Sequence, residues 1–140
     1  MNTLVQQTFT ATLPSLELLR TLVVAALSGV DGQIVSDVEL IATELVTNAH
    51  LHGRPPIQFR LYYADPATLR MDVTDSAAAL PRVMHPDSEA EHGRGLLLVQ
   101  AMSTTWGVLK VGTGKTVWAE FVLSSGQASS DAVCQGQSTR

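Results

Sequence analysis

The amino-acid sequence predicts an α+β fold, a two-layer sandwich with helices on one face of a largely antiparallel sheet. Three observations support this class. Stretches in which apolar and polar residues alternate occur mainly in adjacent pairs, as in β-hairpins. Stretches with helical spacing are grouped together instead of separating every pair of strands. A long aperiodic segment sets the last helix and hairpin apart from the first hairpin, an order that favours segregated helices over a parallel sheet.

The first part of the chain is expected to contain one strand and two helices. The threonine-rich stretch 4–12 alternates loosely and predicts the first strand. The first helix is expected to open at Ser15 and to end near Gly29. We expect the second helix to begin at Ser36, because "SDVE" has the spacing of a capping box, and to run to about Gly53.

The second part alternates between strands and aperiodic chain. Period-two patterns with β-branched and aromatic residues predict four strands, at 57–64, 68–75, 105–111 and 116–123. The segment 76–92 has no clean period and carries two prolines, which predicts a long mobile loop that acts as a lid. A third helix is expected to follow Gly95.

Composition indicates one globular domain. The chain has 140 residues, of which 45% are hydrophobic and 16% are charged. These values are typical of a folded chain with a core of its own. We expect the domain to span 1–123, and the tail 124–140, rich in Ser, Gln and Gly, to be disordered.

Charge and cysteine content exclude several classes of protein. The net charge is −4 and no basic stripe is present, so no nucleic-acid partner is expected. No apolar run approaches the roughly 20 residues that span a bilayer, so no membrane association is expected. A single cysteine, Cys134, excludes an internal disulfide and favours a reducing compartment. We therefore expect a cytoplasmic protein.

The stretch "VGTGKTVWAEF", residues 111–121, contains the Gly-Lys-Thr of a phosphate-binding loop. That motif would also require a glycine at position 109 and a helix afterwards. Position 109 is Leu109, and the residues after Thr116 alternate as a strand. The stretch therefore predicts a hairpin turn, which Gly112 and Gly114 suit.

Polar residues in three places are candidates for a functional site. Glu44 and Asn48 are four residues apart in the predicted second helix, so they share one face beside its apolar stripe. Asp75 ends a predicted strand, and Gly93 and Gly95 precede a predicted helix, where the backbone can approach an anionic ligand. Each feature alone is also typical of a helix surface, a turn or a hinge.

The order and spacing of these pieces, with the late "GTGKT" turn, resembles the Bergerat-fold, histidine-kinase-like ATPases. Within that superfamily, "ELVTNAHLHG", "GRGLLLV" and "GKTVWAEF" look most like the stand-alone anti-sigma-factor serine/threonine kinases of bacteria. The resemblance covers roughly residues 4–123. It implies a kinase that binds ATP and Mg²⁺, holds a sigma factor, and phosphorylates a serine or threonine of an anti-sigma factor antagonist protein. It also implies a homodimer.

The resemblance further implies a role for each matching residue. Glu44 would be the catalytic base, and Asn48 would bind Mg²⁺ through its side-chain oxygen. Asp75 would accept a hydrogen bond from the exocyclic amine of adenine, and Thr116 would support Asp75 and the base. The other implied nucleotide contacts are Gly93, Arg94, Gly95, Leu96, Gly114 and Lys115.

One departure from the family pattern leaves a second function open. The family usually has D-x-G-x-G after the strand-end aspartate, whereas the run from Asp75 to Ala79 has no glycine. The presence of Glu44 favours the kinase. The missing glycines favour a non-catalytic or nucleotide-sensing module of the same fold that only binds partners. An ATP hydrolase acting alone is less favoured, since we expect no second domain for it to drive.

Overall fold

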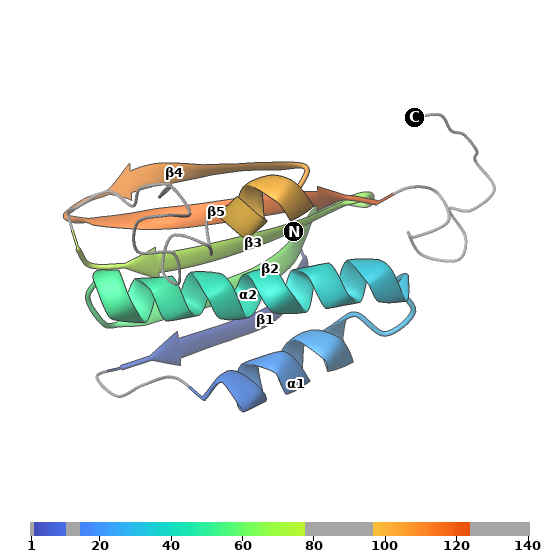
Figure 1. Ribbon diagram of the computed structural model, residues 1–140, viewed down its shortest axis with the longest axis horizontal. Coiled ribbons are helices and arrows are strands. Elements are labelled where there is room, and N and C mark those ends of the chain that lie inside the picture. The colour runs from blue at the N-terminus through green and yellow to red at the C-terminus, as the bar shows by residue number, and fades with distance from the viewer. Residues whose placement is uncertain (1, 11–14, 78–96, 124–140) are drawn as a thin grey trace.

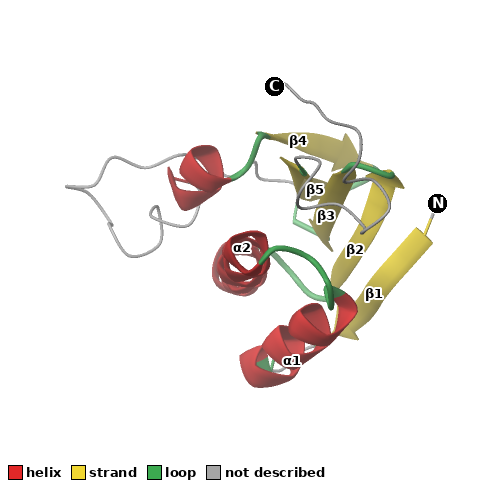
Figure 2. Cartoon of the chain, turned by 90° about the vertical axis from the view of Figure 1, so that its right-hand side faces the viewer, coloured by secondary structure: helices red, strands yellow, loops and turns green. Residues whose placement is uncertain are grey.

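The computed structural model describes residues 2–10, 15–77 and 97–123. Within them, five strands form one sheet in the order β1-β2-β3-β5-β4, and every neighbouring pair is antiparallel. The strands are β1 (Asn2–Phe9), β2 (Ile57–Asp65), β3 (Thr68–Asp75), β4 (Thr105–Val111) and β5 (Gly114–Val122). The helices of the described residues lie on one side of this sheet (Figures 1 and 2). The predicted two-layer α+β sandwich is therefore confirmed.

Helix α1 (Leu16–Ala26) begins where the sequence predicts. The hydroxyl of Ser15 accepts a hydrogen bond from the N–H of Leu18 at 3.3 Å, which caps the first turn. After the helix, Gly29 adopts a φ of 89°, a conformation that glycine tolerates best. The chain then turns directly into the second helix.

Helix α2 (Gly32–His52) starts four residues before Ser36, so the predicted start is wrong. The carboxylate of Asp31 accepts hydrogen bonds from the N–H groups of Gln33 and Ile34 at 3.0 and 3.4 Å. An aspartate is as good a cap as a serine, and the earlier start adds a turn whose apolar side chains pack against the core. Ser36 is an exposed residue inside the helix.

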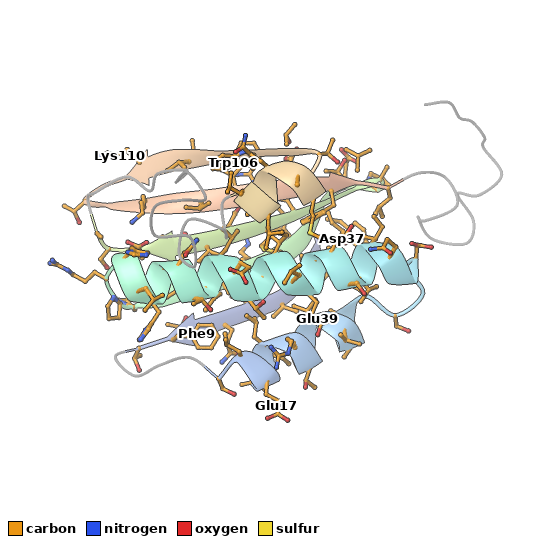
Figure 3. All side chains as sticks on the ribbon, viewed as in Figure 1. Phe9, Glu17, Asp37, Glu39, Trp106 and Lys110 are labelled. Carbon is orange, nitrogen blue, oxygen red and sulfur yellow. The ribbon has the colours of Figure 1, made fainter. Side chains whose placement is uncertain are left out.

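The core lies between the helices and one face of the sheet. In β3 the side chains that face the helices are buried at alternate positions, ending with Asp75. The apolar stripe of α2 packs on them, as the predicted amphipathic pattern requires. In Figure 3, Phe9 lies on the helix side of β1, whereas Glu17 of α1 points away from the sheet. The stripe of α2 consists of Val38, Ile41, Ala42, Leu45, Val46 and Ala49.

A short helical segment over residues 97–102 covers the β4–β5 end of the same sheet face (Figure 2). Val99 of this segment is fully buried, and Trp106 and Val108 of β4 pack against the same core. This segment is part of the helix predicted after Gly95, whose start lies outside the described residues. Most of the predicted lid and the tail 124–140 also lie outside them.

The β4–β5 hairpin confirms that the stretch 111–121 contains a hairpin turn followed by a strand, and that it is not a phosphate-binding loop. Val111 pairs with Gly114, which leaves Gly112 and Thr113 as a two-residue turn. Gly112 has a φ of 59°, as expected for the first central residue of a type II′ turn. Strand β5 begins at Gly114, two residues earlier than predicted, because Gly114 already pairs with β4 and Lys115 pairs with both β4 and β3.

Candidate functional site

One edge of α2 carries the first part of the candidate site. Figure 3 shows Asp37 and Glu39 on opposite edges of this helix, with Glu39 toward α1. The carboxylate of Glu39 lies 3.8 Å from the guanidinium of Arg20. Glu44 and Asn48 follow Asp37 by seven and eleven residues, so they share its edge, away from α1. Both are half-buried, as expected for polar residues beside an apolar stripe.

This edge offers two complementary kinds of oxygen. The amide oxygen of Asn48 is a hard ligand of the type that Mg²⁺ accepts alongside waters and phosphate oxygens. The carboxylate of Glu44 is one helical turn away and can accept a proton. Among the described residues, no group of three or more His, Cys, Asp and Glu side chains gathers to hold a metal ion. Any metal at this edge would therefore need ligands from a bound molecule or from water.

The second part of the candidate site is a buried ion pair at the end of β3. Asp75 has a side chain that is 2% exposed, and that of Lys115 is 6% exposed. The ammonium of Lys115 lies 3.0 Å from Oδ2 of Asp75 and 3.1 Å from Oδ1. The backbone N–H of Ala77 also donates a hydrogen bond to Oδ1, at 2.7 Å. The carboxylate is thus almost fully satisfied by the protein itself.

Two glycines let other backbone segments approach Asp75 closely. A Cβ on Gly53, at the C-terminus of α2, would lie 2.5 Å from both Cγ and Oδ2 of Asp75. A Cβ on Gly114 would overlap the carbonyl oxygen of Asp75. The ends of α2 and β3 and the start of β5 therefore meet at one residue, Asp75. Gly114 was predicted to touch a nucleotide, and in the structure it allows β5 to pair tightly with β3.

The expected support of Asp75 by Thr116 is not found, and Lys115 makes that contact instead. Asp75 and Lys115 are opposite each other in the β3–β5 ladder, so their side chains share the helix-facing side of the sheet. Thr116 is the next residue and points to the other side, where its hydroxyl lies 2.7 Å from that of Thr74. Lys115 was expected to contact nucleotide, but its pairing with Asp75 was not foreseen.

The face of the sheet opposite the helices carries a different polar network. The guanidinium of Arg70 bonds Asp72 at 2.9 Å and Glu120 at 3.5 Å, and it lies 4.4 Å from the centre of the Trp118 ring. The hydroxyl of Tyr62 donates to Asp72 at 3.1 Å. Burial, and then the nearby Asp72 carboxylate, raise the pKa of Tyr62 above its usual value. Arg70 thus joins a carboxylate of its own strand to a carboxylate and an aromatic ring of β5, so we interpret this network as stabilising the sheet.

Other predicted site residues lie outside the described part of the chain. These are Gly93, Arg94, Gly95 and Leu96. Their contacts with a triphosphate stay a prediction. No helix in the described segments is both long enough and apolar enough to cross a membrane.

Two solved structures share the fold. The RsbU and RsbW domains of Rv1364c from Mycobacterium tuberculosis align with a TM-score of 0.65 and 20% identity, over 85% of this chain and 32% of that chain. The histidine kinase domain of the EL346 blue-light activated histidine kinase from Erythrobacter litoralis aligns with a TM-score of 0.54 and 20% identity, over 85% of this chain and 66% of that chain. The chain thus spans less than two thirds of either structure, and at this identity the likeness shows the fold alone.

No curated protein matches the sequence. The family profile of the histidine kinase-like ATPase domain, however, matches residues 9–121. That range runs from the end of β1 into β5 and includes Glu44, Asn48, Asp75 and Lys115. The sheet order, the helices on one face and the sequence profile agree, and the chain belongs to the histidine kinase-like ATPase domain family.

Proposed function

We propose that this protein is a cytoplasmic anti-sigma regulatory factor. It binds ATP with Mg²⁺, phosphorylates a serine or threonine of an anti-sigma factor antagonist protein, and sequesters a sigma factor, acting as a homodimer. Membership in an ATPase domain family supports ATP as the ligand. The motifs "ELVTNAHLHG" and "GKTVWAEF" support the anti-sigma branch by their resemblance to it.

The observation that carries this proposal is the position of Asn48 and Glu44 on the edge of α2 that faces away from α1. Asn48 and Glu44 are half-buried, one helical turn apart, on the edge away from α1. ATP supplies the phosphoryl group, and its transfer needs mainly positioning and charge neutralisation. In this proposal Asn48 holds Mg²⁺, and the carboxylate of Glu44 takes the proton of the attacking hydroxyl.

The described residues fit ATP with one condition. A buried carboxylate such as Asp75 suits an exocyclic amine, because a hydrogen bond is stronger in a medium of low dielectric constant. In the structure, however, that carboxylate is bonded to Lys115 and to the N–H of Ala77. A base can bond Asp75 in this way only when Lys115 has moved.

Phosphotransfer from radiolabelled ATP to candidate antagonist proteins of the same cell tests the proposal. We expect Glu44→Gln to lower the transfer rate by about 10²- to 10⁴-fold, because a general base acts mainly in the transition state. The ATP affinity of this variant, measured by calorimetry, should change by less than about twofold, since a uniform binding contact is not removed.

Glu39→Gln is the matched control. It removes the same charge from the opposite edge of α2, where Glu39 faces Arg20. Transfer by this variant should match that of the wild type. If wild type and Glu44→Gln label every antagonist equally little while sigma-factor binding persists, the kinase function is wrong.

The second candidate function is a non-catalytic or nucleotide-sensing module that only binds partners. The Asp75–Lys115 ion pair favours it, because the carboxylate expected to recognise the base is already neutralised within the protein. This candidate predicts that sigma-factor binding persists while no antagonist protein is phosphorylated, and a change of that binding with ATP would indicate the nucleotide-sensing form. The kinase predicts phosphotransfer as well.

A further inference from the structure

The charged group nearest to Asp75 is a residue of the chain itself. We infer that Lys115 is an internal competitor for the Asp75 carboxylate, so that Lys115 sets how tightly the site binds a nucleobase that carries an exocyclic amine. This inference rests on the proposed nucleotide site and adds to it the residue that controls base recognition. Breaking the Asp75–Lys115 ion pair would free the carboxylate for the base, whereas an intact pair would block it.

Asp75 already uses most of the hydrogen-bonding positions of its carboxylate. A carboxylate offers about four lone-pair positions. The Lys115 ammonium occupies one on each oxygen, through a hydrogen bond to Oδ1 at 3.1 Å and an ion-pair contact with Oδ2 at 3.0 Å, and the N–H of Ala77 uses a second on Oδ1, at 2.7 Å. At most one position remains, on Oδ2.

The remaining position on Oδ2 is enclosed on the side of α2. Oδ2 is the oxygen that lies against Gly53, where even one added carbon would come within 2.5 Å. The amine of a base needs at least as much room as that carbon, so it cannot approach Oδ2 from the α2 side. Of the two sides of the carboxylate that the described residues define, Gly53 closes one and the Lys115 ammonium occupies the other.

Lys115 can both hold its position beside Asp75 and leave it. Its side chain is almost fully buried, and a buried ammonium without a partner is costly, which keeps the pair closed in the absence of ligand. A lysine has a flexible four-carbon stem and a compact charge, so it can withdraw without moving the strand. The binding energy of the base then has to offset the loss of the ion pair.

Calorimetric titration with ATP and with inosine triphosphate tests the inference. Inosine triphosphate has the same phosphates, but a carbonyl replaces the exocyclic amine. We expect Lys115→Thr to bind ATP at least about tenfold more tightly than the wild type, with a much smaller gain for inosine triphosphate. An equal gain for both nucleotides would show only a change of net charge, and it would overturn the inference.

Graded and matched variants complete the series. Lys115→Arg keeps the ion pair and should bind ATP no more tightly than the wild type. Lys115→Gln keeps a neutral hydrogen-bond donor, so its ATP affinity should lie between those of the wild type and Lys115→Thr. It provides a second test should the Thr variant fold poorly. Lys110→Thr is the control, because Lys110 is exposed and lies opposite Lys115 in the β4–β5 ladder. Its affinity for ATP should stay within about threefold of the wild type, as a rim charge should have a small effect.

A measurement without nucleotide tests the ion pair itself. Urea unfolding of Asp75→Asn, Lys115→Gln and the double variant forms a double-mutant cycle. We expect the double variant to be more stable than the sum of the two single effects predicts. Additive effects would show that the pair is not formed in solution, and they would overturn the inference.

The outcomes separate this inference from the proposed function. If wild type binds ATP and Lys115→Thr binds it no more tightly, Lys115 is not a competitor, although the nucleotide site stands. If Lys115→Thr gains ATP affinity but no antagonist is phosphorylated, the inference stands and the kinase fails. If no variant binds any nucleotide, the nucleotide site is wrong, and the inference is wrong with it.

Discussion

The backbone of Gly53 lies directly against the carboxylate of Asp75. The C-terminus of α2 therefore contacts the last residue of β3. An added Cβ at Gly53 would lie 2.5 Å from Oδ2 of Asp75 and 2.6 Å from the carbonyl oxygen of Ala49. The helix layer and the candidate site are therefore in contact at a point where no side chain fits. A change in this contact should affect both stability and the position of Asp75.

We expect Gly53→Ala to destabilise the protein by about 1–3 kcal/mol, the usual cost of forcing extra atoms into a packed site. Gly32→Ala is the matched control. Gly32 is the first residue of the same helix, and an added Cβ there would meet nothing within 4 Å. Since alanine favours a helix over glycine, the control should be neutral or slightly stabilising. Urea unfolding measures both, and equal effects would contradict the close contact.

Thr116 provides a test of which face of β5 belongs to the site. Its hydroxyl bonds that of Thr74 on the face opposite Asp75. We expect Thr116→Val to lower the free energy of unfolding by about 1 kcal/mol, through loss of this hydrogen bond. The double variant Thr74→Val/Thr116→Val should recover part of that loss, because neither hydroxyl is then left without its partner.

The ATP affinity of Thr116→Val should stay within about twofold of the wild-type value, since the valine is nearly isosteric and points away from Asp75. Calorimetry measures it. A folded Thr116→Val protein that has lost most of its ATP affinity would show that this threonine does belong to the base site.

The raised pKa of Tyr62 predicts how stability depends on pH. An unfolded tyrosine ionises near pH 10, whereas burial and Asp72 let the native state keep this proton to higher pH. The stabilising contribution is therefore complete below about pH 10 and is lost as the pH rises through the pKa of the folded state. In Tyr62→Phe this proton is absent, so the stability of the variant should fall less steeply above pH 10.

Urea unfolding between pH 8 and pH 11 measures this difference between the two proteins. Tyr63→Phe, which removes the other tyrosine hydroxyl of the chain, is the control. The stability of Tyr63→Phe should fall with pH nearly as steeply as that of the wild type, and more steeply than that of Tyr62→Phe. Identical alkaline slopes for wild type and Tyr62→Phe would contradict a raised pKa at Tyr62.

Local pattern was enough to predict the sheet and the helices, because burial repeats with the period of each element. It was less reliable at boundaries where two similar signals compete. Asp31 and Ser36 are both good helix caps, and the choice depends on whether Ile34 and Val35 pack against the core, which they do. That packing is a property of the folded molecule and is not encoded in the four residues of a capping box.

The site was harder to predict, because its main contact depends on strand register. Asp75 and Lys115 are forty residues apart, and only the pairing of β3 with β5 makes them neighbours. A shift of one residue would have placed Thr116 at Asp75, as the family resemblance led us to expect. The shared helix face of Glu44 and Asn48 was easier to predict, since spacing within one helix determines a shared face without any long-range contact.

Asn48, on the edge of α2 that faces away from α1, provides a test of the proposed Mg²⁺ site. If Asn48 holds Mg²⁺, then Asn48→Ala should remove most of the increase in ATP affinity that Mg²⁺ causes, which we expect to be about tenfold or more. Binding without Mg²⁺ should be nearly unchanged, because the amide then has no metal to hold. Asp37→Ala is the control, since Asp37 is on the same edge but three turns earlier (Figure 3). Calorimetry with Mg²⁺ and with a chelator measures both states. If Asn48→Ala lowers the affinity equally in the two conditions, this residue contacts the nucleotide or supports the helix, and it is not the metal ligand.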